Sequence, residues 1–496
     1  MEPSGRGASI LARKEAQQAI STETCIGGRS AAKRRGLSWA IRQPNGTAVI
    51  RLFGYVVAKV LRRAAETVTV DLTSFESALT RVPEGTLMVI APSHRSYMDF
   101  LLCSYLFFDQ PQLGVAIPHI AAAEEFSRIP IIGWLFEKAQ AFFVKRGMRR
   151  KDYAELRERI ADLVSRRQTL QVFIEGTRSR SRQFLRPRHG LLRCLQETGQ
   201  SATILPVALS YERVTEEASF LRELAGSPKP KMRLRTLSSW TTRLMRGKIK
   251  MGHVHIACGT PIMLDEFSRL RDVAEAVNGQ LQAQTVTTTL HLRSFLRANQ
   301  LEGDLDWLSA MLKLRGGQVL RSEGDFGQAI TPLLERCMRY HWIHLFYAEA
   351  RALFPDNPAI QHHISLNGYL QSPTLAALPP DSDPRVPQLL RALFEPVCQN
   401  YLIVIDSLGK PGDSLEGINA TTVLLKNPSS FLPDVQAAFD ALLKRRILAH
   451  SQEPRSYRWG PCAPELEDFR RSCLFRHPSM AENGALHQMK ESEAET

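Results

Sequence analysis

Residues 86–109 read TLMVIAPSHRSYMDFLLCSYLFFD. The opening TLMVIA is apolar and rich in strand-forming residues, so it predicts a short buried strand. The run YMDFLLCSYLFF, which begins at Tyr97, is apolar enough to predict a helix packed on a sheet. A strand followed at once by such a helix is typical of an α/β domain.

The same alternation extends from about residue 84 to residue 262. Besides TLMVIA, the runs that predict short buried strands are LGVAIP, FFVKR, TLQVFIE, TILPVALSY and HVHIACG. Between them lie the helical stretches KDYAELRERIADLVSRR and HGLLRCLQETG. We therefore predict an α/β domain in which helices cover the sheet.

Four segments follow from this reading. Residues 1–45 are a weakly ordered basic arm, or a transit peptide, and 46–265 form the α/β domain with a leading amphipathic helix. Strand patterns fade afterwards, so 266–480 are predicted to be mostly helical. The polar, acidic residues 481–496 are predicted to be a disordered tail.

The leading helix is AVIRLFGYVVAKVLRR, residues 48–63. Its apolar residues recur at helical spacing on one face, while Arg51, Lys59, Arg62 and Arg63 lie off that face. Such a basic amphipathic helix either packs on the domain or contacts an anionic membrane surface. Both interpretations stay open at the level of sequence.

The chain of 496 residues carries a formal net charge of +14. Between residues 141 and 190, fourteen Lys and Arg residues stand against five Asp and Glu, which suits phosphate, anionic lipid, an acidic carrier protein or nucleic acid. The eight cysteines form no C-x-x-C pair, which indicates a reducing compartment without a disulfide framework or zinc site. We expect no membrane-spanning segment and no signal peptide, because no apolar run is long enough.

His94 and Asp99 form an H-x4-D pair just after the first strand. Histidine is the side chain best suited to take a proton from a hydroxyl near neutral pH. A carboxylate on its other ring nitrogen would fix the tautomer and stabilise the imidazolium. The hydroxyl would belong to a substrate, because a G-x-S-x-G nucleophile motif is absent, which also argues against a serine-type lipid hydrolase.

The segment FIEGTRSRS, residues 173–181, follows another strand and enters a loop. Gly176 permits a tight turn or a close ligand approach. Thr177 and Ser179 offer hydroxyl groups, and Arg178 and Arg180 offer guanidinium groups suited to phosphate. This combination predicts a phosphate-binding loop.

Two further strand ends add to this picture. In FFVKRG, Lys145 and Arg146 end an apolar run and are predicted to face the same pocket. In ILPVALSY, Pro206 interrupts a buried run, which predicts a strand edge or start that shapes a wall of the site. His253 and His255 alternate on a predicted strand, and placement on one face of that strand is their simplest interpretation.

The four blocks PSHRSYMDF, FFVKR, FIEGTRSRS and ILPVALSYER follow in the order and spacing of the glycerolipid acyltransferase superfamily. Within it, the chain resembles the glycerol-3-phosphate and dihydroxyacetone-phosphate acyltransferases. The likeness covers about residues 48–265, and it extends weakly to MRYHWIHLFYAEA. It implies a mixed, largely parallel sheet covered by helices, followed by a mostly helical C-terminal region.

The resemblance also implies roles for individual residues. His94 would be the general base that activates the acceptor hydroxyl, and Asp99 would orient it. The acceptor would be bound through its phosphate by the loop residues and by Arg146; the loop residues are Glu175, Gly176, Thr177, Arg178 and Ser179. Lys145 and Arg180 are possible additional site residues, as is Pro206, which would mark the fourth block. One position departs from the pattern, because Gln140 stands where the second block usually begins with Gly.

The expected function is acyl transfer from acyl-CoA or from an acylated acyl carrier protein to the 1-hydroxyl of glycerol 3-phosphate. Alternative acceptors are dihydroxyacetone phosphate and, more distantly, lysophosphatidate or another lysophospholipid. The expected reaction needs no metal or cofactor. A non-enzymatic protein that binds anionic membranes or nucleic acid is the alternative, although no helix-turn-helix, zinc-finger or RNA-binding signature occurs, so no nucleic-acid partner is expected. Peripheral attachment is expected, to the cytoplasmic face of a bacterial inner membrane or to an organellar membrane in a eukaryote.

Overall fold

The computed structural model describes residues 23–25, 48–127, 132–138, 140–145, 150–230, 234–301, 305–321, 332–367, 383–453 and 456–474. The chain forms two compact units. The first unit comprises 1–221, 229–345 and 369–375, and the second comprises 222–228, 346–368 and 376–496. Apart from residues 23–25, the predicted N-terminal arm lies outside the described residues, as does the predicted C-terminal tail.

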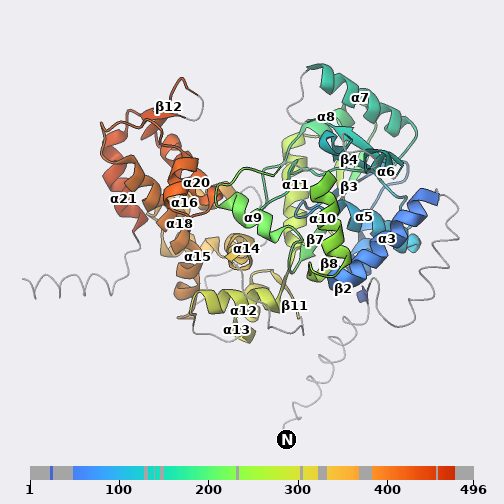
Figure 1. Cartoon of the computed structure of the whole chain (residues 1–496), viewed down its shortest axis with the longest axis horizontal. Coiled ribbons are helices and arrows are strands. Elements are labelled where there is room, and N and C mark those ends of the chain that lie inside the picture. The colour runs from blue at the N-terminus through green and yellow to red at the C-terminus, as the bar shows by residue number, and fades with distance from the viewer. Residues whose placement is uncertain are drawn as a thin grey trace, which may run out of the picture. The chain divides into compact units, whose positions relative to one another are not determined.

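A nine-stranded sheet forms the core of the first unit (Figure 1). In spatial order its strands are β1 (Glu23–Cys25), β2 (Ala65–Asp71), β8 (Gly252–Cys258), β7 (Ala202–Tyr211), β3 (Leu87–Pro92), β6 (Leu170–Gln171), β4 (His119–Ala123) and β5 (Ala141–Val144). The ninth strand, β9 (Ile262–Leu264), pairs with β7. Most neighbours are parallel, and only β1–β2, β7–β8 and β7–β9 are antiparallel. The predicted mixed, largely parallel sheet is confirmed.

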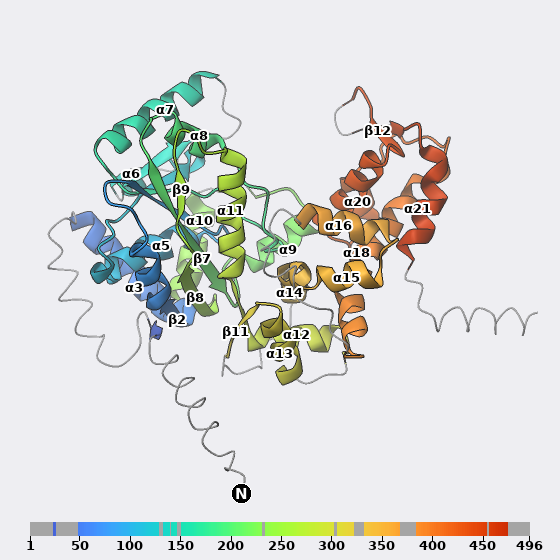
Figure 2. The same ribbon diagram turned by 180° about the vertical axis from the view of Figure 1, so that it is seen from behind.

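Three helices cover one face of this sheet: α7 (Arg150–Ser165), α8 (Gly190–Gln196) and α11 (Leu270–Ala283). Their apolar side chains form one buried cluster with Val89 of β3, and Leu163, Leu192 and Val277 represent the three helices in it. Figure 2 shows these helices on the side of the sheet opposite to α3 (Ala48–Ala64) and α5 (Met98–Asp109). The central strands β3 and β7 are therefore buried on both faces, as expected for strands with parallel neighbours.

The opposite face carries α3, α5 and α4 (Leu72–Leu79), with α10 (Leu234–Met245) against α3. Asp71 begins α4 as an N-cap that accepts a hydrogen bond from the backbone N–H of Ser74 at 3.1 Å. Phe75 of α4 contacts Phe107 of α5 edge to face, with ring centroids 6.3 Å apart. The leading helix predicted from the sequence is α3, and no described helix is long and apolar enough to cross a membrane.

One predicted strand is wrong in position. The run LGVAIP, residues 113–118, begins at the end of a 3-10 turn, η1 (Pro111–Leu113), and continues as irregular backbone. Gly114 follows that turn with φ +68°, and this left-handed conformation is incompatible with the extended backbone of a strand. The strand β4 begins only at His119, after Pro118, where backbone N–H groups can again join the ladder.

Helices predominate in the rest of both units, as predicted. The first unit continues with β10 (Val286–Thr288), α12 (Thr289–Ala298), α13 (Leu305–Leu314), β11 (Gln318–Leu320), α14 (Pro332–Trp342) and η3 (Ile343–Leu345). The second unit contains α15 (Tyr347–Leu353), α16 (Pro358–Asn367), α18 (Val386–Leu408), α19 (Ala420–Lys426), α20 (Leu432–Lys444), β12 (Leu448–His450), β13 (Tyr457–Trp459), η5 (Ala463–Glu465) and α21 (Leu466–Cys473). Three short segments remain, namely η2 (Glu124–Phe126), α6 (Ile132–Lys138) and α9 (Glu217–Leu224).

Candidate active site

Three parallel strands end at the same edge of the sheet and carry the candidate site. His94 follows β3, Glu175 follows β6, and Tyr211 is the last residue of β7. Because β3 pairs in parallel with both β6 and β7, their carboxyl ends meet. Segments that are about 120 residues apart in the sequence are thereby brought into contact.

His94 and Asp99 form the pair predicted from their spacing. The distance between His94 Nδ1 and Asp99 Oδ2 is 2.9 Å. The imidazole stacks on Phe173, with ring centroids 4.1 Å apart, and its side chain is 19% exposed. Its Nε2 has no hydrogen-bonding partner among the described residues, so this atom is available to a substrate hydroxyl.

Asp99 lies in the first turn of α5 and is fully buried. Its Oδ2 accepts hydrogen bonds from the backbone N–H groups of Arg95 at 2.6 Å and Ser96 at 2.8 Å. Its Oδ1 accepts one from the Tyr211 hydroxyl at 2.7 Å. These donors stabilise the ionised carboxylate, and the helix N-terminus adds to their effect. Burial, with the Asp99 charge, raises the pKa of Tyr211 well above its usual value, so the phenol stays a donor.

Glu175 is buried and braces the loop that carries His94. Its carboxylate pairs with Arg95 Nη1 at 2.7 Å and accepts hydrogen bonds from the backbone N–H groups of His94 at 3.1 Å and Leu185 at 3.0 Å. Both carboxylate oxygens are therefore used inside the protein. This placement favours a positioning role over direct contact with an acceptor.

Arg178 is the basic residue of the loop that reaches the site. Its guanidinium donates to Glu216 Oε1 at 3.2 Å and lies 3.6 Å from the centroid of the Tyr97 ring. Glu216 also accepts from the backbone N–H of Tyr97 at 2.6 Å and from the Ser96 hydroxyl at 2.8 Å. The planar cation is thus held in one orientation, which suits it to a forked contact with a phosphate group.

The other loop residues shape the turn around Arg178. Gly176 has φ +68°, and a Cβ there would lie 2.9 Å from Arg188 Cγ, so both the backbone and the space favour glycine. Ser179 donates from its hydroxyl to the Gln183 carbonyl at 2.6 Å, and its N–H donates to the His94 carbonyl at 2.9 Å. The Thr177 hydroxyl accepts from Arg180 at 3.0 Å.

The second block lies at the end of β5. Lys145 pairs with Asp152 of α7 at 2.7 Å and is not among the residues that line the cavity at His94. Arg146 lies outside the described residues. Gln140, which stands where the resemblance leads us to expect Gly, adopts φ +68°. The left-handed turn is thus kept at a cost of roughly 1–2 kcal/mol for a residue with a Cβ.

Pro206 lies in the middle of β7, so the predicted edge or start of a strand is wrong. Its carbonyl accepts a hydrogen bond from the Gly259 N–H at 2.8 Å. On this edge β7 pairs first with β9, through residues 202–204, and then with β8, through residues 207–211. The proline thus occupies the gap where β9 gives way to β8. No ladder hydrogen bond is lost there, which explains why a central strand accepts it.

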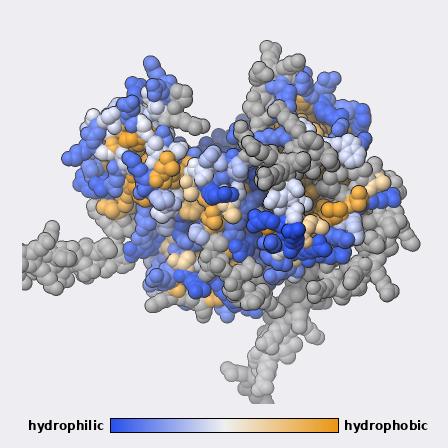
Figure 3. Space-filling view, viewed as in Figure 1, coloured by the Kyte–Doolittle hydropathy of each residue, from blue (hydrophilic) through white to orange (hydrophobic). Residues whose placement is uncertain are grey.

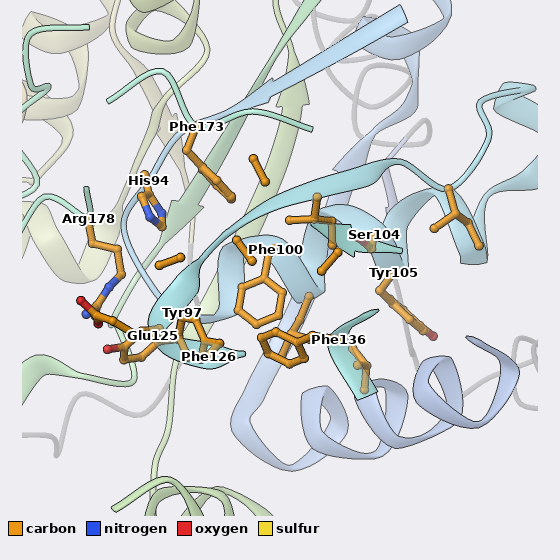
Figure 4. Close-up of a pocket in the computed structure, with 18 of the residues that line it drawn as sticks. His94, Tyr97, Phe100, Ser104, Tyr105, Glu125, Phe126, Phe136, Phe173 and Arg178 are labelled. Atoms are coloured by element: carbon orange, nitrogen blue, oxygen red, sulfur yellow. The ribbon is translucent and has the colours of Figure 1, made fainter. Parts of the chain in front are cut away.

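A largely apolar cavity of about 1080 Å³, its open mouth included, begins at His94. Figure 4 shows His94, Phe173 and Arg178 at one end, Phe100 and Phe136 in the middle, and Ser104 and Tyr105 at the other end. The inner face of α3 contributes Ile50, Gly54 and Val57 to the lining. The few charged residues of the lining are Glu125, Arg178 and Lys229. A long apolar chain fits this lining with its head at His94.

The sequence patterns did not identify Tyr211, Glu216, Tyr97 or the cavity. The polar run SYERVTEE directly after a buried strand is the one signal for the first two, because polar groups at the carboxyl end of a parallel strand often face a site. In the described ranges, the groups around His94 include no set of three potential metal ligands.

Comparisons with known proteins agree with this geometry. Residues 76–210 match the family model "Acyltransferase". The chain is 30% identical over 284 residues to a glycerol-3-phosphate acyltransferase of Xylella fastidiosa, which covers 55% of this chain and 31% of that protein. It is 31% identical over 227 residues to a dihydroxyacetone phosphate acyltransferase of Bos taurus, which covers 43% of this chain and 32% of that protein. The matched stretch spans about a third of the length of these relatives.

One solved structure is also similar. It is a 1-acyl-sn-glycerophosphate acyltransferase from Thermotoga maritima, 19% identical, and the match covers 50% of this chain and 83% of that one. The TM-score of this match is 0.30.

Proposed function

The chain carries an acyltransferase domain of the family that includes glycerol-3-phosphate and dihydroxyacetone-phosphate acyltransferases, and from this premise we propose that it transfers a fatty acyl group from a thioester to the 1-hydroxyl of glycerol 3-phosphate. The observation that carries the proposal is the meeting of His94 and Arg178 at the mouth of one apolar cavity. The reaction needs a base, a residue that binds the phosphate and a site for the acyl chain, and these three parts meet here.

His94 Nε2 takes the proton of the acceptor hydroxyl as the oxygen attacks the thioester carbonyl carbon. Asp99 accepts the Nδ1–H, which keeps Nε2 basic and stabilises the imidazolium that forms. When the tetrahedral intermediate collapses, the C–S bond breaks and the imidazolium returns its proton to the departing thiolate. The base is thus regenerated, and no covalent acyl-enzyme is required.

Arg178 binds the acceptor phosphate in this proposal. A guanidinium that already lies against an aromatic ring loses little freedom when a phosphate binds. The phosphate competes with Glu216 for Arg178, and Arg180 beside it supplies a second cation. The same loop is bound to the His94 segment through the Ser179 N–H, so the phosphate site and the base keep a fixed distance.

The fatty acyl chain lies in the apolar cavity between α3 and α5. Each methylene removed from water contributes about 0.8 kcal/mol, so a lining of Phe100, Phe126 and Phe136 favours long chains. Acyl-CoA and acylated acyl carrier protein both fit a thioester head at His94. The basic surplus between residues 141 and 190 suits the acidic character of either donor.

Peripheral membrane attachment is part of the proposal. Leu52, Tyr55 and Val56 of α3 are 63%, 42% and 42% exposed, while Ile50 and Val57 of the same helix are buried. Figure 3 shows hydrophobic surface flanked by hydrophilic surface where Figure 1 places α3. The basic residues Arg51, Lys59, Arg62 and Arg63 suit an anionic lipid surface.

Two alternatives are weaker. Dihydroxyacetone phosphate carries the same phosphate and a comparable hydroxyl, so it remains the second candidate acceptor, supported by the bovine relative. A non-enzymatic binding protein would not need His94 and Arg178 in one cavity. Their shared placement therefore argues against it.

The deciding experiment is an acyl-transfer assay of the full-length protein with glycerol 3-phosphate, dihydroxyacetone phosphate and unphosphorylated glycerol side by side. We expect the highest kcat/KM with glycerol 3-phosphate and almost no transfer to glycerol. Arg178→Ala should raise the KM for glycerol 3-phosphate roughly 10- to 100-fold, because a charge-assisted hydrogen bond contributes about 1.5–3 kcal/mol.

The matched control is Arg186→Ala, a change at an exposed arginine eight residues further along the chain. Its kinetics should stay close to wild type. Equal turnover of glycerol and glycerol 3-phosphate would contradict the phosphate-binding role. Faster acylation of dihydroxyacetone phosphate would replace the proposed acceptor with the second candidate.

A further inference from the structure

A second group of chemically active side chains lies where β2, β7 and β8 adjoin. It consists of Glu66 on β2, Glu212 directly after β7 and His253 on β8. Each offers one potential ligand atom, and these atoms lie within 4.8 Å of one another. The group is built by the sheet itself, because Thr67, next to Glu66, is the register partner of His253 and the Glu212 N–H donates to the His253 carbonyl at 2.8 Å.

Glu212 is the most unusual member of this group. It is only 4% exposed, and within the described residues its carboxylate forms no ion pair with a lysine or arginine. Its Oε2 accepts from the backbone N–H of His253 at 3.0 Å, whereas its Oε1 is buried and accepts no hydrogen bond. A buried carboxylate without a cation is strongly destabilising. A bound cation removes that cost.

His253 is held ready to act as a ligand. The distance from its Nδ1 to Thr67 Oγ1 is 2.6 Å, and its buried Nε2 makes no hydrogen bond. In the tautomer in which Nδ1 carries the proton and donates it to Thr67 Oγ1, the lone pair of Nε2 is available beside the two glutamates. Metal-binding histidines usually have a hydrogen-bonding partner on the ring nitrogen that does not bind the metal, and this partner fixes the tautomer.

The distances suit a metal ion better than an ion pair. His253 Nε2 lies 3.4 Å from Glu66 Oε2. That is too long for a strong charge-assisted hydrogen bond, but two ligand atoms on a tetrahedral zinc ion are about 3.3 Å apart when the bonds are about 2.0–2.1 Å. Rotation of the carboxyl groups closes the wider separations, and Glu66 is 42% exposed and can move.

Gly252 completes the case for a built site. Its φ is +65°, and a Cβ at this position would overlap Glu212 Oε2. Glycine is therefore the residue that lets the buried carboxylate approach the β8 backbone. From these observations we propose that Glu66, Glu212 and His253 bind one Zn²⁺ ion, with water as the fourth ligand on the exposed side of Glu66.

A nitrogen ligand with two carboxylates favours zinc over magnesium, which prefers six oxygen ligands. The bound ion would link three strands of the sheet. It would therefore stabilise the folded chain by mass action, and this effect does not depend on the proposed acyl transfer.

The test uses the full-length protein after removal of metals with EDTA, and it combines equilibrium dialysis against Zn²⁺ with thermal unfolding. We expect one zinc ion per chain and a Tm that rises with zinc concentration. Glu66→Gln should weaken zinc binding at least tenfold, and Thr67→Val, which removes the partner of Nδ1, should weaken it about tenfold or more. Glu76→Gln, a change at an exposed glutamate of α4, is the matched control and should bind zinc like wild type.

Two results would overturn the zinc site. One is a wild-type Tm that is the same with and without zinc. The other is zinc binding that is undiminished in Glu66→Gln. A Tm lowered equally in this variant with and without zinc would show that Glu66 and His253 form only an ion pair. Because no readout involves acyl transfer, failure here leaves the proposed enzymatic function untouched.

Discussion

His94 depends on a chain of contacts that leads away from the cavity. Asp99 orients it, and Tyr211 with two backbone N–H groups holds Asp99. The spacing of His94 and Asp99 was readable in the sequence because both residues belong to one turn and one helix. Tyr211 lies 112 residues beyond Asp99, and only the pairing of β3 with β7 brings it there.

Tyr211→Phe should lower kcat about tenfold with little change in KM. The variant removes a 2.7 Å hydrogen bond to the Asp99 carboxylate, and a bond to a charged group contributes about 1.5–3 kcal/mol, part of which acts on the orientation of His94. Steady-state kinetics with both substrates varied will separate the two constants. Tyr153→Phe on α7 is the control, and an equal loss of kcat in both variants would speak against a specific role for Tyr211.

The role of Glu175 could not be predicted from its residue type and position in the sequence. Its place in FIEGTRSRS suggested contact with the acceptor, yet its oxygens are occupied by Arg95 and two backbone N–H groups. A buried carboxylate beside an arginine is a brace for the loop, and its removal would leave Arg95 uncompensated. The sequence does not indicate whether the Glu175 side chain points towards the acceptor or towards the loop that carries His94.

At the scale of elements, the two faces of helix α3 correspond to the two alternatives that its sequence left open. Its inner residues Ile50, Gly54 and Val57 line the cavity, so it packs on the domain. Its outer residues Leu52, Tyr55 and Val56 stay exposed. An amphipathic pattern cannot distinguish these cases, because each needs one apolar face and α3 has apolar side chains on both.

We predict that the double change Leu52→Ser with Val56→Ser lowers affinity for vesicles containing phosphatidylglycerol at least tenfold. Each large apolar side chain that enters a lipid surface contributes about 1.5–3 kcal/mol at full burial. Co-sedimentation of the full-length protein at low and high salt measures the effect. Leu425→Ser, at an exposed leucine of α19, is the control. Unchanged sedimentation of the double variant would remove α3 as the membrane contact.

Strand prediction succeeded where runs were buried on both faces, as in β3, β7 and β8. It failed in two instructive places. The run LGVAIP is apolar because Leu113 and Val115 are buried, but the surrounding glycine and prolines prevent pairing. The strand β2, with the alternating AETVTVD, was missed. Its partner β8 lies far along the chain, and the sequence does not indicate that the two strands pair.

At the scale of the whole molecule, both units contain buried neutral histidines. Burial lowers the pKa of His291 and His344 in the first unit to about 3, and for His291 the nearby Arg182 charge adds to the effect. Burial, with the His362 charge, lowers the pKa of His363 in the second unit to about 3. These histidines bind a proton in the unfolded chain below about pH 6.5 but not in the folded one.

Stability should therefore fall as the pH drops from about 6.5 to 5. The slope is about 1.4 kcal/mol per pH unit for each such histidine in the unit that unfolds. Urea denaturation at several pH values will measure it. His291→Gln should make the slope shallower, and His450→Gln, at an exposed histidine, should leave it unchanged. A stability that stays constant across this window would mean that these histidines are not buried and neutral.

The class of the fold and the acyltransferase domain could be predicted from the sequence, because periodicity and four ordered blocks are local features. The division of the chain into its two compact units could not be predicted from the sequence. The contacts place residues 229–345, which include α11, in the same unit as the sheet, and α11 packs on β7 and β9. The apolar cavity was also beyond prediction, since its lining gathers residues from α3, α5, β4 and the loop before Arg178.

The role of His94 as the base is tested most directly by His94→Ala in the full-length protein, assayed with glycerol 3-phosphate and an acyl thioester. General-base catalysis contributes about a hundred- to ten-thousand-fold, so transfer should fall by that factor while Tm stays near wild type. His450→Ala serves as the control at an exposed histidine. Near-normal turnover by a folded His94→Ala variant would contradict the mechanism.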